Sequence, residues 1–480
     1  MSLQKEAVRS VSWLALFKFS SQIISWVVTI VIARILLPDD YALSAMATII
    51  TGYAEIFSEL GLGASIIQRK FNSRKNLASV FWFALFVSIG FAALCFPISY
   101  ITADIFDEPQ IIPLTQAVAI LFIFSGLQVV PLNLLKRRLN FKMVGLIEMK
   151  CTIISSIGMV IIAMLGGGVW ALVGGRIIRG AVKLILVYQA VKWRPLVHFD
   201  YSEAAGYLKF GILVAMSSSF FYLFQMSDRY FAGRAWSLTE LGYYLFALQL
   251  SQLPTEKIVV LINQVSYPVL SKLQDNLAEM KSFYLNVIHV TSFLVLPIFV
   301  SGFLLGYELV EIILGEKWLP MTTLFEFLCL VQILTSLSAI NSFVHMSKGK
   351  PSYSMYYYLI LTLTMSVSYY IAVQYGMHAI IYPWISTYLV VEFAWIYFTM
   401  RRLDIKIVEY FRSVMHPLTA TICMVIGVLL YEQHVVVLAD YKIADLLTKI
   451  VLSMVIYFAY IYTFNRKILT YARNMIRRKG

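Results

Sequence analysis

Charged residues are scarce in this chain. They make up 14% of its 480 residues, whereas hydrophobic residues make up 60%. Soluble globular domains carry about 25% charged residues. The composition therefore excludes a soluble domain and indicates a polytopic membrane protein.

Cysteine, histidine and nucleotide-binding motifs are scarce or missing as well. The four cysteines all fall inside apolar stretches, which argues against a disulfide framework. The six histidines are scattered, and none has ligand spacing to another histidine or to a cysteine, so we expect no metal and no other cofactor. The sequence has no Gly-x-x-x-x-Gly-Lys-Ser/Thr motif, which argues against an ATP-driven machine.

Long apolar runs, by contrast, are abundant. A helix needs about 20 apolar residues to cross a bilayer, and we count 14 such stretches. Their centres lie near Gln22, Gly52, Ile89, Phe122, Ser156, Arg179, Ser217, Ser251, Leu294, Ile333, Thr364, Thr387, Cys423 and Met454. We therefore predict an all-α membrane protein with 14 transmembrane helices.

The basic residues support this count. If the N-terminus is cytoplasmic and the spans alternate, 27 of the 39 basic residues fall on the cytoplasmic side and five on the outer side. This is the positive-inside pattern, and it places both termini in the cytoplasm. We interpret the net charge of +13 as a topology signal that matches anionic membrane lipids, and not as a nucleic-acid-binding surface.

The sequence contains an internal repeat with an offset of 200 residues. Arg34–Ala42 and Arg234–Gly242 each read as a basic residue, a short turn and an acidic residue in the first turn of a helix. We expect two pseudosymmetric six-helix lobes around a central cavity, followed by a helix pair. Two lobes with the same orientation would hold a substrate between them and expose it to each side in turn. The predicted boundaries are 1–192 and 207–400 for the lobes, 412–465 for the additional helix pair and 466–480 for a basic cytoplasmic tail.

Basic residues also occur inside the predicted spans. Arg176, Arg179 and Lys183 follow an i, i+3, i+7 spacing that puts them on one face of the sixth span. Cations in hydrocarbon cost roughly 2.5–3.5 kcal/mol each on insertion scales, so this face must meet protein or a wet cavity. With Lys18 and Arg229 they are candidates to bind an anion. The alternative is that they form structural ion pairs inside the bundles.

Acidic and amide side chains form a second candidate set. Glu55, Glu59, Glu256, Glu326 and Glu392 lie within predicted spans, where a carboxyl group could bind a coupling ion, H⁺ or Na⁺. The alternative is ion pairing with Lys18 or Lys257. The polar stripes include Gln22, Gln225, Gln249 and Gln252; they suit sugar hydroxyls, or else hydrogen bonding between helices.

Four stretches resemble a known family: Ala33–Leu43, Glu59–Ser65, Asp228–Arg234 and Tyr267–Gln274. They are similar to bacterial polysaccharide flippases of the multidrug/oligosaccharidyl-lipid/polysaccharide (MOP) superfamily, and most similar to the colanic-acid and teichuronic-acid exporter branch. The sequence departs from the family signature at Ala42, where glycine is more common.

The resemblance implies a function. Such a protein translocates an undecaprenyl-pyrophosphate-linked oligosaccharide repeat unit from the cytoplasmic to the outer leaflet of the bacterial inner membrane by alternating access. It would be a transporter and not an enzyme, driven by H⁺, Na⁺ or the membrane potential, and its partners would include the polysaccharide polymerase and export machinery. A pyrophosphate is the kind of anion that Arg and Lys side chains bind well.

Two other functions stay open from the sequence. A multidrug/cation antiporter of the same superfamily would need an acidic cavity, whereas the N-terminal half is basic inside its spans. A membrane polysaccharide polymerase or ligase would need a long outer loop with catalytic residues, and the predicted outer loops are short.

Overall fold

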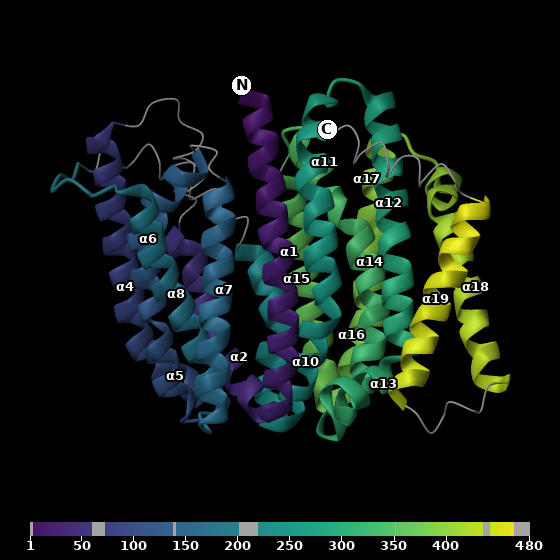
Figure 1. Cartoon of the computed structure of the whole chain (residues 1–480), viewed down its shortest axis with the longest axis horizontal. Helices are drawn as coiled ribbons and strands as arrows, with labels where there is room; N and C mark the ends of the chain where they lie inside the picture. Colours follow the sequence, from purple (N-terminus) through teal and green to yellow (C-terminus); the bar gives the residue numbers. More distant parts are fainter. Residues whose placement is uncertain are drawn as a thin grey trace. The chain divides into compact units, whose positions relative to one another are not determined.

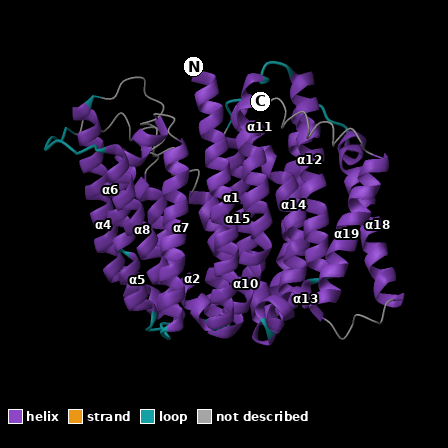
Figure 2. Ribbon diagram, viewed as in Figure 1, coloured by secondary structure: helices purple, strands orange, loops and turns teal. Residues whose placement is uncertain are grey.

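The computed structural model describes residues 3–59, 73–137, 141–200, 219–350, 352–434 and 442–464. Within these ranges the chain is helical and contains no strand (Figure 2). The all-α prediction is therefore confirmed. The basic tail predicted at 466–480 lies outside the described residues.

Nine of the predicted spans are confirmed as helices long and apolar enough to cross a membrane, among the residues that the structure describes. They are Arg74–Phe106, Ile111–Arg137, Lys142–Met164, Leu277–Leu304, Glu316–Ser347, Ser352–Tyr375, Met377–Arg402, Ile407–His434 and Lys442–Phe464. A tenth candidate is the pair Ser20–Ile35 and Pro38–Ile49, which is bent by 117°. The full count of 14 stays a prediction.

The chain forms two compact units, Met1–Gly242 and Tyr243–Gly480. In Figure 1 the helices of the first unit are α1 (Leu3–Ile35), α2 (Pro38–Glu59), α4 (Arg74–Phe106), α5 (Ile111–Val118), α6 (Ile120–Arg137), α7 (Phe141–Met164), α8 (Val169–Val191), an unlabelled helix over 219–235 and the start of α10 (Leu238–Pro254). Helix α7 packs against both α1 and α8, and α6 packs against α4 and α8.

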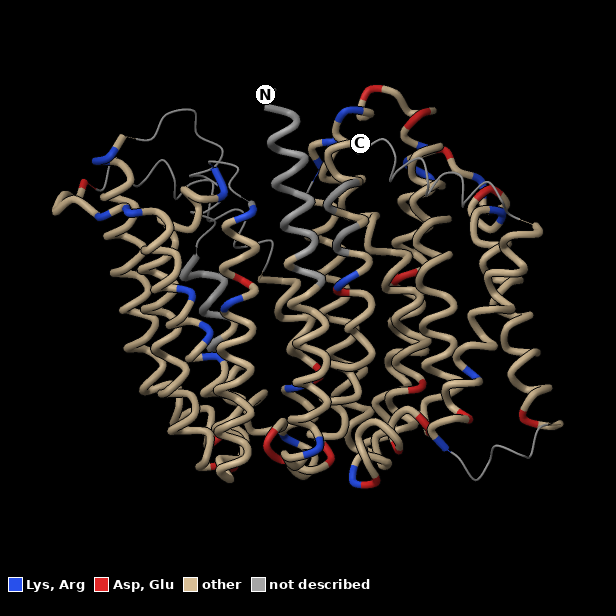
Figure 3. Tube along the Cα trace, viewed as in Figure 1, with Lys and Arg blue, Asp and Glu red and all other residues tan. Residues whose placement is uncertain are grey.

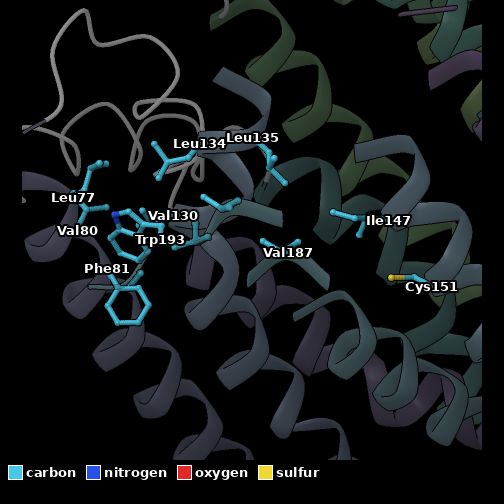
Figure 4. Packing of buried hydrophobic residues seen from close by; sticks show 13 residues of the cluster. Leu77, Val80, Phe81, Val130, Leu134, Leu135, Ile147, Cys151, Val187 and Trp193 are labelled. Atoms are coloured by element: carbon cyan, nitrogen blue, oxygen red, sulfur yellow. The ribbon is translucent and has the colours of Figure 1, made fainter. Parts of the chain in front are cut away.

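The core of the first unit is aliphatic and aromatic. Figure 4 shows one end of this core, where Phe81 of α4, Val130 of α6 and Val187 of α8 are buried. Our predicted topology puts this end nearer the cytoplasm. Trp193, directly after α8, packs edge-on against Phe81, with 5.5 Å between the ring centroids. This packing fixes α8 against α4 and α6 at one end.

The second unit contains the rest of α10 and a longer series of helices. They are η1 (Thr255–Val259, a π-helix), α11 (Val260–Lys272), α12 (Leu277–Leu304), α13 (Gly306–Leu309), η2 (Val310–Leu314), η3 (Glu316–Met321), α14 (Thr322–Ser347), α15 (Ser352–Ala372), η4 (Val373–Tyr375), η5 (Met377–Ile380), α16 (Ile381–Ile385), α17 (Thr387–Arg402), α18 (Ile407–His434) and α19 (Lys442–Phe464). Helices α18 and α19 pack against each other, and α18 also runs along α12. The structural division at residue 242 differs from the predicted lobe boundaries, which remain a prediction.

The two predicted repeat turns fold alike. The Leu37 amide donates to Asp40 Oδ2 at 2.9 Å, and the Ser237 amide donates to Glu240 Oε2 at 3.1 Å. In both turns an acidic residue in the first helical turn accepts from the backbone three residues earlier, which is half of a capping box. The 200-residue offset seen in the sequence thus corresponds to the same local structure at both places.

Candidate anion-binding site

The tight turn before α8 brings this helix against α7. Gly166 and Gly168 have φ values of +80° and +50°, which favour glycine. Further along, Gly158 of α7 lies so close to α8 that an added Cβ would come within 2.4 Å of Ile178 Cδ1. Small residues of this kind allow close helix packing in membranes. Helix α8, with 23 residues, is about 35 Å long and is sufficient to cross a bilayer.

The close packing joins two of the predicted cations to one carboxylate. Arg179 Nη2 lies 2.7 Å from Glu148 Oε2 on α7, and Lys183 Nζ lies 2.9 Å from Glu148 Oε1. Arg179 also donates to Thr152 Oγ1 at 3.1 Å. Glu148 therefore bridges two basic side chains, one with each of its oxygens.

Glu148 was missed by the sequence analysis, which considered anions on other spans. The available signal was the spacing of Glu148, Thr152 and Ser155, which puts three polar side chains on one face of α7. A pairing between two helices cannot be seen in the pattern of either helix alone. The pairing of Arg179 and Lys183 with Glu148 is a structural ion pair of the kind that the sequence left open as the alternative, with a different carboxylate.

The cluster has more positive than negative charge. Among the side chains that the structure describes, Arg179 and Lys183 carry two positive charges against the single negative charge of Glu148, and Arg176 lies exposed one turn away on α8. Figure 3 shows Lys and Arg along the middle of α8 and not only at its ends. A buried ion pair in hydrocarbon needs several hydrogen bonds to offset desolvation, and Thr152 supplies one of them.

The cations are paired but still accessible. The side chain of Arg179 is 44% exposed, against 26% for Glu148 and 24% for Lys183. A guanidinium group offers a planar fork to phosphate oxygens, and an ammonium group acts as a point charge. An incoming phosphate could thus take the place of the Glu148 carboxylate without leaving either cation unpaired in an apolar environment.

The other predicted site residues are placed as follows. Gln22 on α1 and Arg229 on the helix over 219–235 are half-buried, and Gln225 on the same helix is exposed. The side chains of Lys18, Glu55 and Glu59 lie outside the described residues. Among the described side chains of the first unit, the structure brings together Arg179 and Lys183 of the predicted set, through Glu148.

The remaining predicted residues belong to the second unit. Gln249 is exposed and Gln252 is half-buried on α10. Glu256 is exposed on η1, where its carboxylate lies 3.8 Å from Lys257 Nζ. This is the ion-pairing alternative that the sequence offered.

The fold defines the class of protein. The model resembles the solved structure of the lipid II flippase MurJ in its inward closed conformation, with a TM-score of 0.77 and 13% sequence identity over 95% of this chain and 99% of that one. The chain is thus a multi-pass membrane protein with the fold of MOP superfamily transporters.

The sequence comparison defines the family. Residues 31–323 match the family described as "Polysaccharide biosynthesis protein", and the chain belongs to this family. It is similar to the teichuronic acid biosynthesis protein TuaB of Bacillus subtilis, with 25% identity over 82% of this chain and 83% of that protein. It is also similar to the lipopolysaccharide biosynthesis protein WzxC of Escherichia coli, with 24% identity over 70% and 69% of the two chains.

Proposed function

We propose that this protein translocates an undecaprenyl-pyrophosphate-linked oligosaccharide repeat unit from the cytoplasmic to the outer leaflet of a bacterial inner membrane, for surface polysaccharide export. The family, the relatives in teichuronic acid and lipopolysaccharide biosynthesis, and the flippase-like fold support this proposal. The observation that carries it is the half-buried Arg179, paired with Glu148 inside an apolar helix bundle.

The Glu148 bridge suggests how such a substrate is bound and released. Without substrate, Glu148 neutralises part of the charge on Arg179 and Lys183, so the helix pair remains stable in the bilayer. A pyrophosphate, with more charge and more oxygens than one carboxylate, displaces Glu148. On the outer side, the return of Glu148 to the two cations favours release of the pyrophosphate group. No bond is made or broken in this cycle, as expected for a transporter and not an enzyme.

The protein would work with other components of the pathway. The translocated unit becomes a substrate for polysaccharide polymerase and export machinery on the outer side. Both termini would be cytoplasmic, where the basic loops contact anionic lipids. Alternating access of the two predicted lobes would carry the headgroup across.

The rival function is a multidrug/cation antiporter. A site for cationic drugs would need an excess of negative charge, whereas the α7–α8 cluster has an excess of positive charge. This observation favours an anionic headgroup as the substrate.

Reconstituted vesicles distinguish these functions. Purified full-length protein is placed in vesicles that contain an undecaprenyl-pyrophosphate-linked oligosaccharide, and the accessibility of the glycan to an external lectin is followed over time. We expect glycan transfer between leaflets in protein-containing vesicles and no uptake of the cationic dye ethidium. Ethidium uptake without glycan transfer would support the antiporter, and formation of longer glycans would support a polymerase.

A further inference from the structure

A second site lies in the core of the second unit, whereas the α7–α8 cluster belongs to the first. Glu392 of α17 lies near the middle of the apolar span Met377–Arg402 and is only 2% exposed. The Tyr357 hydroxyl on α15 donates a short hydrogen bond to Glu392 Oε1. The other oxygen, Oε2, is buried and has no hydrogen-bond partner.

Two other hydroxyl groups near this carboxyl group have hydrogen-bond partners of their own. Ser338 and Tyr388 are near Glu392. However, the Tyr388 hydroxyl shares a 2.8 Å hydrogen bond with Thr335 Oγ1, and Ser338 Oγ donates to the Thr335 carbonyl at 3.3 Å. Oε2 itself makes no hydrogen bond with either hydroxyl, so it can hold a hydrogen of its own.

No cation balances Glu392 within the described part of the chain. The ion pairs found there do not include it. His345 of α14 shares a 3.0 Å hydrogen bond with Thr399 Oγ1, and its ring packs at a tilt against Trp395. The titratable groups that face Glu392 from the surrounding helices are Tyr357 and Tyr358 of α15, Tyr388 of α17 and Tyr410 of α18.

This arrangement suits a neutral carboxyl group. An isolated carboxylate in an apolar interior is very unfavourable, and such a group neutralises by taking up a proton. Tyr357 donates to one oxygen, and the protonated form carries its own hydrogen on the other, so that no charge is buried without a counterion.

We infer that Glu392 is a proton-binding site, protonated in the conformation seen here and deprotonated when the second unit opens to water. The ligand that we infer is a proton. Among the described residues, no group of three or more His, Cys, Asp or Glu side chains is placed to hold a metal ion. A role for this proton in driving transport rests on the proposed function.

The site is connected to a break in a neighbouring helix. Thr335, the partner of Tyr388, lies one turn from Gln332 on α14. Gln332 Oε1 accepts a hydrogen bond from Thr255 Oγ1 at 3.0 Å, and Thr255 begins the π-helical segment η1 directly after Pro254. Such segments often mark functional hinges. Loss of the proton from Glu392 would rearrange the hydroxyls on α14 that hold this segment.

Infrared difference spectroscopy tests the protonation directly. The spectrum of purified full-length protein at neutral pH is compared with that of Glu392→Gln, which keeps the shape of the side chain. We expect the difference to show the C=O stretch of a protonated carboxyl group, shifted down in heavy water. Glu279→Gln, which changes an exposed carboxylate at the start of α12, is the control and should show no such band.

Two further spectra keep the inference falsifiable. Tyr357→Phe removes the hydrogen bond to Oε1, so the C=O band should move to higher frequency while remaining present. The inference would be overturned if the wild type and Glu392→Gln showed the same spectrum in the region of the protonated carboxyl band. A band that disappears when Na⁺ is added would also overturn it, because Na⁺ would then be the ligand.

A transport measurement tests the role of the proton. In vesicles that translocate lipid-linked glycan, one pH unit across the membrane should change the final distribution of a substrate coupled to one proton about tenfold. We expect this response in the wild type and in Glu279→Gln, and none in Glu392→Gln. If wild-type vesicles translocate no glycan, the proposed function fails, but the infrared result still decides whether Glu392 binds a proton. Equal pH responses in wild type and Glu392→Gln would contradict the coupling role.

Discussion

Thr239 Oγ1 donates a 2.6 Å hydrogen bond to Asp39 Oδ1, a residue 200 positions earlier in the chain. The two residues occupy equivalent positions in the two repeat turns, since Asp39 precedes Asp40 and Thr239 precedes Glu240. The turns that are related in sequence are thus in direct contact. The contact is very close, because a Cβ on Gly242 would lie 2.1 Å from the Pro38 carbonyl oxygen.

This contact predicts that Gly242→Ala destabilises the protein. The added methyl group would meet backbone atoms that cannot move aside without disturbing the Asp39–Thr239 bond. We expect a loss of about 1–3 kcal/mol, the usual cost of overpacking, measured by thermal unfolding of the purified protein. Gly90→Ala is the matched control, because a Cβ there meets nothing within 4 Å. Equal melting temperatures for the two variants would show that the turns do not pack in this way.

The Glu148 bridge predicts an unusual response to pyrophosphate. Glu148→Gln removes the carboxylate that competes with an incoming anion, so inorganic pyrophosphate should raise the melting temperature of this variant more than that of the wild type. In Arg179→Ala the increase should be lost. Lys150→Ala, an exposed cation on α7, should respond like the wild type. A smaller response in Glu148→Gln than in the wild type would mean that Glu148 does not occupy the anion position.

Whether a feature of the fold or of the candidate site could be predicted from the sequence depends on whether its sequence pattern lies within one helix. The spacing of Arg176, Arg179 and Lys183 was sufficient to predict one cationic face, since i, i+3 and i+7 positions share a face on any helix. Their partner Glu148 was not predictable, because which faces of α7 and α8 meet depends on packing at Gly158 and the turn at Gly168. The repeat turns were predictable because their signal is local.

The span count shows the same limit. Apolar runs such as Arg74–Phe106 were sufficient to predict nine spans that the structure confirms. Spans that carry polar side chains, such as α8, give a weaker composition signal although α8 is long enough to cross. The orphaned oxygen of Glu392 could not be predicted either, because burial and hydrogen bonding are properties of the packed bundle.

The ion pairs of Lys449 predict that the stability of the helix pair α18–α19 depends strongly on this side chain. Its Nζ lies 3.0 Å from Glu308 on α13, 2.9 Å from Glu432 on α18 and 3.1 Å from Asp445 on α19. Lys449→Leu would leave three carboxylates close together without a cation, and breaking a buried ion pair costs about 3–5 kcal/mol. We expect a large drop in melting temperature.

The matched control is Lys442→Ala. This lysine pairs with Glu311 at 2.6 Å, but its side chain is 64% exposed, so water replaces the lost partner and the melting temperature should change little. If Lys449→Leu were as stable as Lys442→Ala, the cluster would not hold the helix pair in place.

The positive-inside pattern predicts the sidedness of the loops. In a background with the four native cysteines replaced, a single cysteine at Glu108 should react with a membrane-impermeant maleimide added to intact cells. A single cysteine at Lys350 should react only after the membrane is opened. The reverse result would place both termini outside the cytoplasm and would require another orientation of the whole chain.

The central claim, that the α7–α8 cations bind the pyrophosphate of a lipid-linked glycan, is tested most directly by translocation in vesicles. The rates of wild type, Arg179→Ala, Arg176→Ala and Lys150→Ala are compared at equal amounts of inserted protein. A charge-assisted hydrogen bond is worth about 1.5–3 kcal/mol, so losing one should slow glycan transfer roughly tenfold or more. We expect this loss for Arg179→Ala and Arg176→Ala and a normal rate for Lys150→Ala. Normal rates for both arginine variants would contradict it.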